Sequence, residues 1–206
     1  MNLKECKKGI RDFFPLKDWK HKAGLQGGYF IRETENIRYD FNYGITNYIN
    51  EFKIGWSSGI AFKSLEKIYI KAKKIDTKSG KTTLYLMDTS PDYFNGKCSI
   101  DYRIKSEEDI VNMYKKIEDF LYNKAPDFFE KVKTMDELDK WLNTNPGSPI
   151  EYVSNSIRFN SQYGIIAAKL NNNPQYMELI DIYRKLQKGD NFAYEFDQVV
   201  EYLKGI

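Results

Sequence analysis

The sequence predicts an α+β fold: a meandering antiparallel sheet of four to five strands, with an N-terminal helix and a helical C-terminal half. Apolar and polar residues alternate almost regularly over residues 36–62, which is typical of strands with one buried face. After Ser106 the apolar period changes from two to about 3.6, the period of an amphipathic helix. Helical spacing also recurs over residues 2–14 and ends before Pro15, which cannot continue a helix interior.

Residues 36–62 are expected to form the central strand pair of this sheet. A short segment, 44–47, interrupts the alternation and suits a connection between two antiparallel strands. Because side chains alternate faces, the pair should have one buried and one solvated face. The apolar row contains Ile37, Tyr39, Phe41, Tyr43, Phe52, Ile54, Trp56, Ile60 and Phe62, and the polar row begins with Arg38, Asp40 and Asn42.

The remaining elements of the first half are less regular. Residues 64–74 fit a short helix, although the run I-Y-I also suits a strand, and the helix is the favoured interpretation. Further strands are expected at 28–34, 82–87 and 98–104. The predicted core includes Phe41, Phe52, Ile54, Trp56, Ile60, Ile100, Ile117 and Phe120.

Two capping boxes mark helix starts in the second half, Ser106 with Asp109 and Thr134 with Glu137. Pro126 can begin a short helix, since its missing N–H is not needed in a first turn. Further helices are expected at 160–170, at 174–186 with Asn173 as the cap and Pro174 first, and at 192–203. The chain is expected to be one domain, 1–206, sheet-rich over 1–105 and helical over 106–206, with 143–150 as the candidate loop boundary.

The formal charge of +3 conceals a difference between the two halves of the sequence. Residues 1–105 carry 20 Lys/Arg against 12 Asp/Glu, a net +8, and residues 106–206 carry 12 against 17, a net −5. A basic half can attract nucleic acid, and rings on a basic sheet can stack on bases. However, the lysines are scattered, and the rings share parity with Ile and Leu, which indicates a core role.

Composition also bears on compartment and cofactors. Cys6 and Cys98 lack metal-site spacing and fit a reducing compartment. The first residues lack the apolar core of a signal peptide, and no run reaches the roughly 18 apolar residues of a membrane span. We therefore expect a cytoplasmic protein with no membrane contact, no metal site and no cofactor.

Residues with catalytic potential are few and poorly placed. His21, the sole histidine, lies between two lysines and is expected to be a solvated loop residue, so histidine-based catalysis is not predicted. The glycines in G-L-Q-G-G at 24–28 precede a strand, so they predict a turn instead of a phosphate-binding loop. Glu33 and Glu35 share strand parity and are expected to be a solvated edge in preference to a catalytic carboxylate pair.

Three stretches carry a resemblance to a known family. They are Y-F-I-R-E-T-E-N-I-R-Y-D-F-N at 29–42, A-P-D-F-F-E-K-V at 125–132, and A-A-K-L-N-N-N-P-Q-Y-M-E-L-I-D-I-Y-R at 167–184. In this order they resemble the bacterial domain-of-unknown-function family 4304, some members of which occur in toxin–immunity settings, with residues 75–97 departing from the family pattern. The resemblance implies a cytoplasmic α+β protein that binds another protein, and it implies no catalytic residues.

The sequence therefore predicts a non-catalytic, immunity-like module whose partner is a cognate, toxin-like protein. The alternatives are nucleic-acid binding through the basic N-terminal half and an unrecognised enzyme. The polar row of the central pair is the candidate recognition surface, because side chains on a rigid sheet are pre-organised for binding. Its residues are Arg38, Asp40, Asn42, Glu51 and Lys53.

Overall fold

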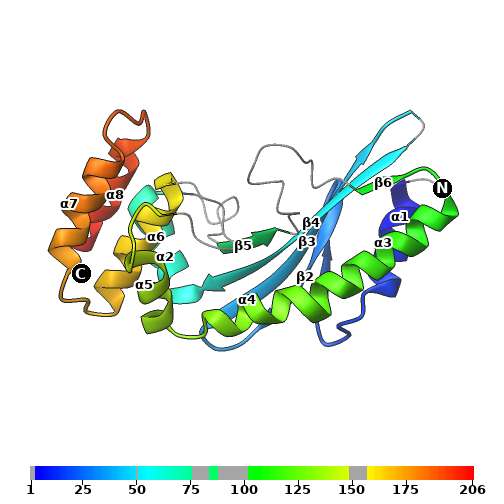
Figure 1. Cartoon of the computed structure of the whole chain (residues 1–206), viewed down its shortest axis with the longest axis horizontal. Coiled ribbons are helices and arrows are strands. Elements are labelled where there is room, and N and C mark those ends of the chain that lie inside the picture. The colour runs from blue at the N-terminus through cyan, green and yellow to red at the C-terminus, as the bar shows by residue number, and fades with distance from the viewer. Residues whose placement is uncertain (1–2, 50, 76–83, 88–101, 149–156) are drawn as a thin grey trace. The chain divides into compact units, whose positions relative to one another are not determined.

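The computed structural model of the chain confirms the α+β fold, with most strands early and most helices late in the sequence (Figure 1). The chain forms two compact units, and each combines segments from both halves of the sequence. The sheet unit comprises Met1–Ile60 and Tyr85–Phe128, and the helical unit comprises Ala61–Leu84 and Phe129–Ile206. The expectation of a single domain stays a prediction. The structure describes residues 3–49, 51–75, 84–87, 102–148 and 157–206.

The strands belong to one antiparallel sheet in which neighbours follow the order β1-β2-β3-β4-β5. The short β6 lies off this path and pairs with the first residues of β4, Phe52–Ile54. Four predicted strands correspond to β2 through β5, and the fifth is found as β6, with residues 98–101 outside the described part. The sequence did not predict β1. The strands are β1 (Lys20–Ala23), β2 (Gly27–Glu33), β3 (Ile37–Asn47), β4 (Phe52–Phe62), β5 (Leu84–Met87) and β6 (Tyr102–Ile104).

A cluster of phenylalanines forms the core of the sheet unit. Phe30 and Phe41 are cross-strand partners on β2 and β3, so their rings share one face of the sheet. Phe14, just after α1 (Leu3–Phe13), stacks on Phe30 with centroids 3.6 Å apart. Phe120, which lies in the helical segment that follows β6, packs against Phe41 with the ring centroids 6.2 Å apart. Each ring is buried, which contributes roughly 1.5–3 kcal/mol per side chain to folding.

The helix that follows β6 begins at the predicted capping box. The Asp109 N–H donates to Ser106 Oγ at 3.2 Å, and the Ser106 N–H donates to Asp109 Oδ2 at 2.9 Å. The stripe predicted after Ser106 forms α3 (Glu107–Asp119), which continues through a π-helical turn, η1 (Phe120–Lys124), into α4 (Ala125–Lys131). Such turns insert an extra residue per turn and shift the buried face.

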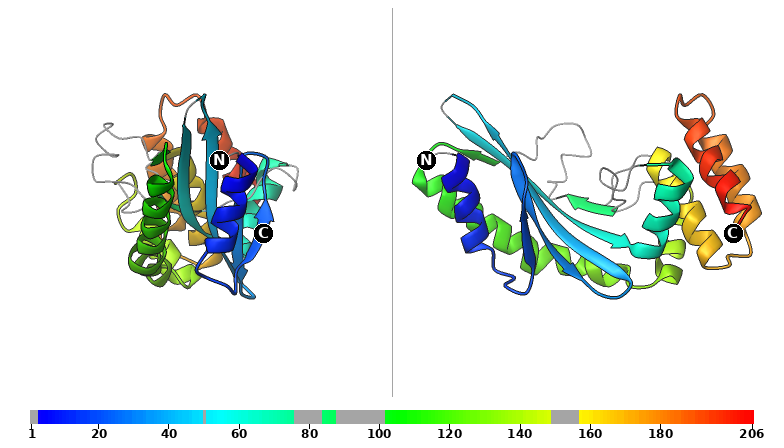
Figure 2. Two further views of the ribbon diagram at one scale, coloured as in Figure 1. Left: turned by 90° about the vertical axis from the view of Figure 1, so that its right-hand side faces the viewer. Right: turned by 180° about the vertical axis from the view of Figure 1, so that it is seen from behind.

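The helical unit is organised around α6, which is buried from Asn160 through Ala168 and contacts four other helices. The favoured helix at 64–74 is confirmed as α2, and the capping box at Thr134 is confirmed at the start of α5. Helices α7 and α8 lie side by side in this unit (Figures 1 and 2). Its helices are α2 (Lys63–Lys73), α5 (Met135–Asn143), α6 (Ile157–Leu170), α7 (Tyr176–Leu186) and α8 (Ala193–Leu203).

The start of α7 differs from the sequence prediction. Asn173 is not the cap: the helix begins at Tyr176, with Gln175 at the N-cap position. Asn173 Oδ1 accepts from the Gln175 N–H at 2.8 Å, which makes a turn one step before the helix. Pro174 therefore lies in this turn and not in the first helical turn.

Most of the predicted core is confirmed. Six of its residues are buried, Phe52 is half-buried, and Ile100 lies outside the described residues. The buried ones are Phe41, Ile54, Trp56, Ile60, Ile117 and Phe120.

No helix among the described residues is long and apolar enough to cross a membrane.

Candidate functional site

Three of the predicted recognition residues lie together on β3, but they are not a solvated surface. Arg38 and Asp40 are each only 5% exposed, with Arg38 Nε 3.9 Å from Asp40 Oδ2. Asn42 Nδ2 donates to Asp40 Oδ1 at 2.6 Å. The expectation of a wet face is corrected at Arg38 and Asp40: opposite charges of neighbouring side chains compensate one another, which permits burial. Their role in binding stays a prediction.

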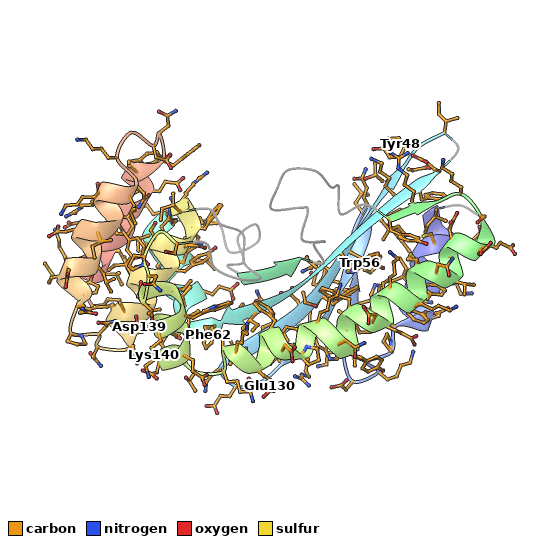
Figure 3. The ribbon with its side chains drawn as sticks, in the orientation of Figure 1. Tyr48, Trp56, Phe62, Glu130, Asp139 and Lys140 are labelled. Carbon is orange, nitrogen blue, oxygen red and sulfur yellow. The ribbon has the colours of Figure 1, made fainter. Side chains whose placement is uncertain are left out.

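The other two predicted recognition residues lie near the start of β4. Glu51 Oε1 is 3.2 Å from Arg103 Nη1, and Glu51 Oε2 is 3.5 Å from Lys105 Nζ. Lys53 Nζ lies 5.2 Å from the centroid of Tyr48, whose side chain is near the tip of the β3–β4 hairpin (Figure 3). These are surface ion pairs and a cation–π contact, each worth at most about 1 kcal/mol.

His21 is on a strand, and the expectation of a loop residue is corrected. It lies in β1 opposite Phe30, and its Nε2 is 3.1 Å from Tyr43 Oη. Burial, with a smaller contribution from the Arg11 charge, lowers the pKa of His21. Burial is also the main cause that raises the pKa of Tyr43 to about 12 and the pKa of the free Cys6 thiol to about 11. The imidazole therefore packs against the sheet in its neutral form near neutral pH.

The predicted turn is found in the glycine run, and the glutamate pair is exposed as predicted, although only Glu33 lies on a strand. The backbone N–H of Gly24 donates to Gly27 O at 3.0 Å, which closes the turn between β1 and β2. A side chain at Gly27 would collide with the backbone oxygen of Tyr43. Glu33 ends β2 and Glu35 follows it, and both are exposed.

An ion cluster that the sequence reasoning missed lies among three helices of the helical unit. Glu195, in the first turn of α8, accepts two hydrogen bonds from Arg158, one from Nε at 2.8 Å and one from Nη2 at 2.6 Å. Lys73, in the last turn of α2, lies 3.0 Å from Glu195 Oε2. Gln162 Nε2 is 3.4 Å from the same oxygen. Arg158 and Gln162 reach one carboxylate because residues four apart on α6 share a helix face. We call these four residues the Glu195 cluster.

Strong charge pairing holds Glu195 ionised in spite of its burial. The side chains of Glu195 and Lys73 are each only 9% exposed, while Arg158 is 29% exposed. The hydrogen bonds from Arg158, followed by those from Lys73 and Gln162, lower the pKa of Glu195 to about 2, against the opposing effect of burial. The two donor bonds from Arg158 form a bidentate pair, which fixes the plane of the guanidinium group.

Three exposed aromatic rings surround the cationic side of this cluster. Arg158 Cζ lies 3.7 Å from the centroid of Phe192 and 5.2 Å from that of Phe159. Lys73 Nζ lies 5.9 Å from the centroid of Tyr194. Phe159, Phe192 and Tyr194 are 38%, 42% and 58% exposed, which is high for large rings. Arg158, Phe159, Phe192 and Tyr194 are called the aromatic–arginine patch below.

A second buried carboxylate of the helical unit is enclosed by amides. Asp139, on α5 beside the exposed Lys140 (Figure 3), is 2% exposed. It accepts from the side-chain amides of Asn143 at 2.6 Å and Asn171 at 2.8 Å, and Asn173 Nδ2 donates to both of its oxygens, at 3.1 and 2.9 Å. These bonds connect α5 with the segment between α6 and α7. We call the four residues the Asp139 network.

The Asp139 network is packed tightly against α6. Asn143 Nδ2 also donates to the Gly164 carbonyl at 2.9 Å, and Tyr183 Oη donates to Asn143 Oδ1 at 2.6 Å. A Cβ added at Gly164 would lie 2.6 Å from both Asn143 Oδ1 and Tyr183 Oη, so a glycine is required at this approach. The network leaves no opening for a ligand at Gly164, which indicates a structural role.

The sequence carries one signal of the Glu195 cluster. The apolar stripe of the last helix runs through Phe192, Phe196 and Val199, and Glu195 lies three residues after the first and four before the last. A charged residue within an apolar stripe indicates a buried ion pair, but the stripe does not identify its partners. Arg158 and Lys73 come from segments 37 and 122 residues away along the chain.

No group of three or more His, Cys, Asp or Glu side chains arranged to hold a metal ion occurs within the described ranges. No protein-family model matches the sequence, and the searches of curated proteins and of solved structures found no match. The resemblance to the domain-of-unknown-function family therefore stays a prediction. The aromatic–arginine patch and the Glu195 cluster beneath it are the candidate functional site, because they combine exposed binding groups with a rigid support.

Proposed function

We propose that this protein is a non-catalytic protein-binding module that contacts its partner through the aromatic–arginine patch. The observation that carries the proposal is the placement of an arginine and three exposed rings on a buried ionic support. The toxin–immunity setting suggested by the family resemblance would make the partner a cognate, toxin-like protein. The patch replaces Arg38 and Asp40 as the centre of the proposed surface, because their buried side chains offer little area to a partner.

The composition of the patch supports protein binding. Arginine and aromatic residues are enriched at the centres of protein interfaces and among the residues that contribute most binding free energy. Phe159 and Phe192 both contact the guanidinium of Arg158, so the exposed groups are contiguous. Exposed apolar side chains that gather in one place are typical of interaction sites, whereas single ones are common on any surface.

The geometry of the patch favours binding because its arginine is already ordered. Immobilising a long side chain at an interface costs about 0.5–1.5 kcal/mol. Two hydrogen bonds to Glu195 and stacking on Phe192 hold Arg158 in the unbound chain. Part of that ordering cost is therefore met during folding, before a partner arrives.

Nucleic-acid binding through a basic N-terminal half has less support. The difference in net charge between the two halves of the sequence does not correspond to a difference of the same kind between the two folded units. The segment 61–84 carries seven Lys/Arg against two Asp/Glu and belongs to the helical unit. The sheet unit then carries 16 basic against 16 acidic residues, a net charge of zero. The helical unit carries 16 against 13, which accounts for the +3 of the whole chain.

The proposal is tested by capture from a lysate of the protein's own host with immobilised full-length chain. Phe192→Ser combined with Tyr194→Ser removes two rings of the patch and leaves Arg158, Lys73 and Glu195 themselves unchanged. We expect this variant to lose a stoichiometric protein partner that the unchanged chain retains, because loss of a central aromatic contact typically costs at least about 2 kcal/mol of binding free energy.

The matched control is Tyr122→Ser, which removes a ring of similar exposure, 55%, from η1 in the sheet unit. The control should capture the partner as well as the unchanged chain does. Equal capture by the Phe192 and Tyr194 variant would show that the patch is not the binding surface. Salt-sensitive recovery of DNA or RNA in place of a protein would favour the nucleic-acid alternative.

A further inference from the structure

We infer that the aromatic–arginine patch recognises an acidic protein segment in which a carboxylate side chain lies next to an apolar one. This inference rests on the proposed function and adds the chemistry of the partner. It is carried by the excess of positive charge in the Glu195 cluster and by the exposure and remaining hydrogen-bond donors of the Arg158 side chain.

The Glu195 cluster contains two cations and one anion. Lys73 and Arg158 both bind Glu195, so the three side chains carry a net charge of +1. Glu195 and Lys73 are nearly buried, and charges in such surroundings are screened less by salt than exposed charges are. An approaching anion is therefore attracted to the cluster, and it can reach the cluster at its most exposed member, Arg158.

The hydrogen bonds of Arg158 leave donors for a second carboxylate. A guanidinium group has five N–H donors, and those on Nε and Nη2 that reach Glu195 account for two. Glu195 is the acceptor found for Arg158 within the described residues. Arg158 retains 29% of its side-chain exposure. The remaining donors can therefore bind a carboxylate in the plane of the group, which is the preferred geometry of such pairs.

The aromatic rings supply the apolar part of the recognition surface. Arg158 Cζ lies over the ring of Phe192, 3.7 Å from its centroid, so the ring contacts the guanidinium group directly. Phe192 and Phe159 keep about two fifths of their surface exposed. A partner that places an apolar side chain on these rings and a carboxylate at Arg158 would satisfy both features.

A protein carboxylate fits this site better than a nucleic-acid backbone does. The net charge of +1 at the cluster matches one monoanion. Proteins that bind single-stranded nucleic acid present a groove of positive charge that follows several phosphates. The patch presents one exposed guanidinium, because Lys73 is 9% exposed and is held by Glu195.

The test uses full-length, isotope-labelled protein and two synthetic peptides with blocked ends, Glu-Phe-Glu-Leu and its neutral counterpart Gln-Phe-Gln-Leu. We expect the acidic peptide to shift the NMR signal of the Arg158 Nε–H group and of the amides next to Phe192. The neutral peptide should bind about tenfold more weakly, since it lacks a charge-assisted hydrogen bond. Arg158→Lys keeps the charge but not the planar fork, and it should weaken binding by a similar factor.

Arg184→Lys is the matched control, because Arg184 pairs with Asp197 on the same unit and is 48% exposed. It should leave peptide binding unchanged. Equal affinity for the two peptides, or shifts at Arg184 instead of Arg158, would overturn the inference. Tighter binding of a ten-nucleotide single-stranded DNA at the same signals would overturn it too.

Failure of this inference is distinguishable from failure of the proposed function. If the acidic peptide has no effect while the Phe192 and Tyr194 variant still loses its captured partner, the patch binds protein through apolar contact and the acidic chemistry is wrong. If capture is unaffected as well, the proposed function is also wrong. The peptide titration of the unchanged chain requires no variant to fold, so it gives a result in either case.

Discussion

The two buried carboxylates of the helical unit are stabilised in different ways. Asp139 accepts hydrogen bonds from three asparagine amides, which are neutral donors. Glu195 accepts from a guanidinium group and an ammonium group, so its charge is more than compensated. Both side chains are almost inaccessible, at 2% and 7% exposure of the residue.

We propose that the difference separates a structural centre, at Asp139, from a binding centre, at Glu195. The three amides around Asp139 all donate to its carboxylate, and Asn143 is also held by the Gly164 carbonyl and the Tyr183 hydroxyl. The Glu195 cluster has a surplus of positive charge, and its arginine reaches the surface among exposed rings. The proposal gives the Asp139 network a role in the fold alone, and it gives Glu195 the role of orienting Arg158 for a partner.

Leaving the control variants aside, the largest effect on stability is expected for Asp139→Ala. The change leaves the amides of Asn143, Asn171 and Asn173 without their shared acceptor, and each unsatisfied buried donor costs about 1–3 kcal/mol. Because Asn171 and Asn173 are half-buried and can recruit water, we expect a loss of about 3–4 kcal/mol in the free energy of unfolding. Urea denaturation of both proteins measures the difference.

Asp136→Ala is the control for this prediction. Asp136 lies one turn earlier on α5, pairs with Lys140 at 2.7 Å and accepts a longer bond of 3.3 Å from Asn171, but its side chain is 51% exposed and Asn171 keeps Asp139 as an acceptor. Its removal should cost less than about 0.5 kcal/mol, as for other exposed pairs four residues apart on a helix. Equal effects of the two substitutions would show that the Asp139 network is not a structural centre.

A smaller loss, on the order of 2–3 kcal/mol, is expected for Glu195→Gln, and it should depend on pH. The pKa of Glu195 is about 2 in the folded chain against an ordinary 4.5, so its ionised form stabilises the fold. This contribution is complete above about pH 4.5 and is lost as the pH falls towards 2. The unchanged chain should therefore lose stability over that window more steeply than Glu195→Gln does, in denaturation series between pH 6 and the lowest pH at which both chains remain folded.

Asp197→Asn provides the comparison on the same helix. Asp197 is 57% exposed and pairs with Arg184 at 3.0 Å, so its removal should change stability by less than about 1 kcal/mol. If Glu195→Gln and the unchanged chain lose stability in parallel as the pH falls, the strong pairing of Glu195 is refuted.

Features that depend on neighbouring residues were predictable from the sequence. Alternation identified β3 and β4, and the spacing of Ser106 with Asp109 and of Thr134 with Glu137 identified two helix starts. Each signal is complete within a few residues, because strand faces and helix caps are local geometry. The same local reasoning was wrong where it took polarity for exposure, as it did at Arg38.

The candidate site was not predictable, since it depends on contacts between distant segments. Arg38 and Asp40 are buried because a charge beside an opposite charge can leave water, which a parity rule does not consider. The Glu195 cluster joins the ends of α2, α6 and α8, and no local pattern specifies that Lys73 and Arg158 meet the same carboxylate. Likewise, the strand that carries His21 is recognisable only from its pairing with β2.

Leaving the control variants aside, the smallest effect on stability is expected for Phe192→Ala, although this residue is central to the proposed surface. The ring is 42% exposed and stacks on Arg158, and such partly exposed cation–π contacts contribute about 0.5–1 kcal/mol. Phe196, four residues later on α8, is 1% exposed, and Phe196→Ala should cost about 3–5 kcal/mol as a core truncation. Thermal and urea unfolding of the two variants, with capture of the partner by Phe192→Ala, make the comparison. A binding residue should lose capture and keep stability, whereas a loss above about 2 kcal/mol for Phe192→Ala would mean that its ring belongs to the core. In that case the distinction between the Glu195 cluster and the Asp139 network would no longer hold, because both would serve the fold alone.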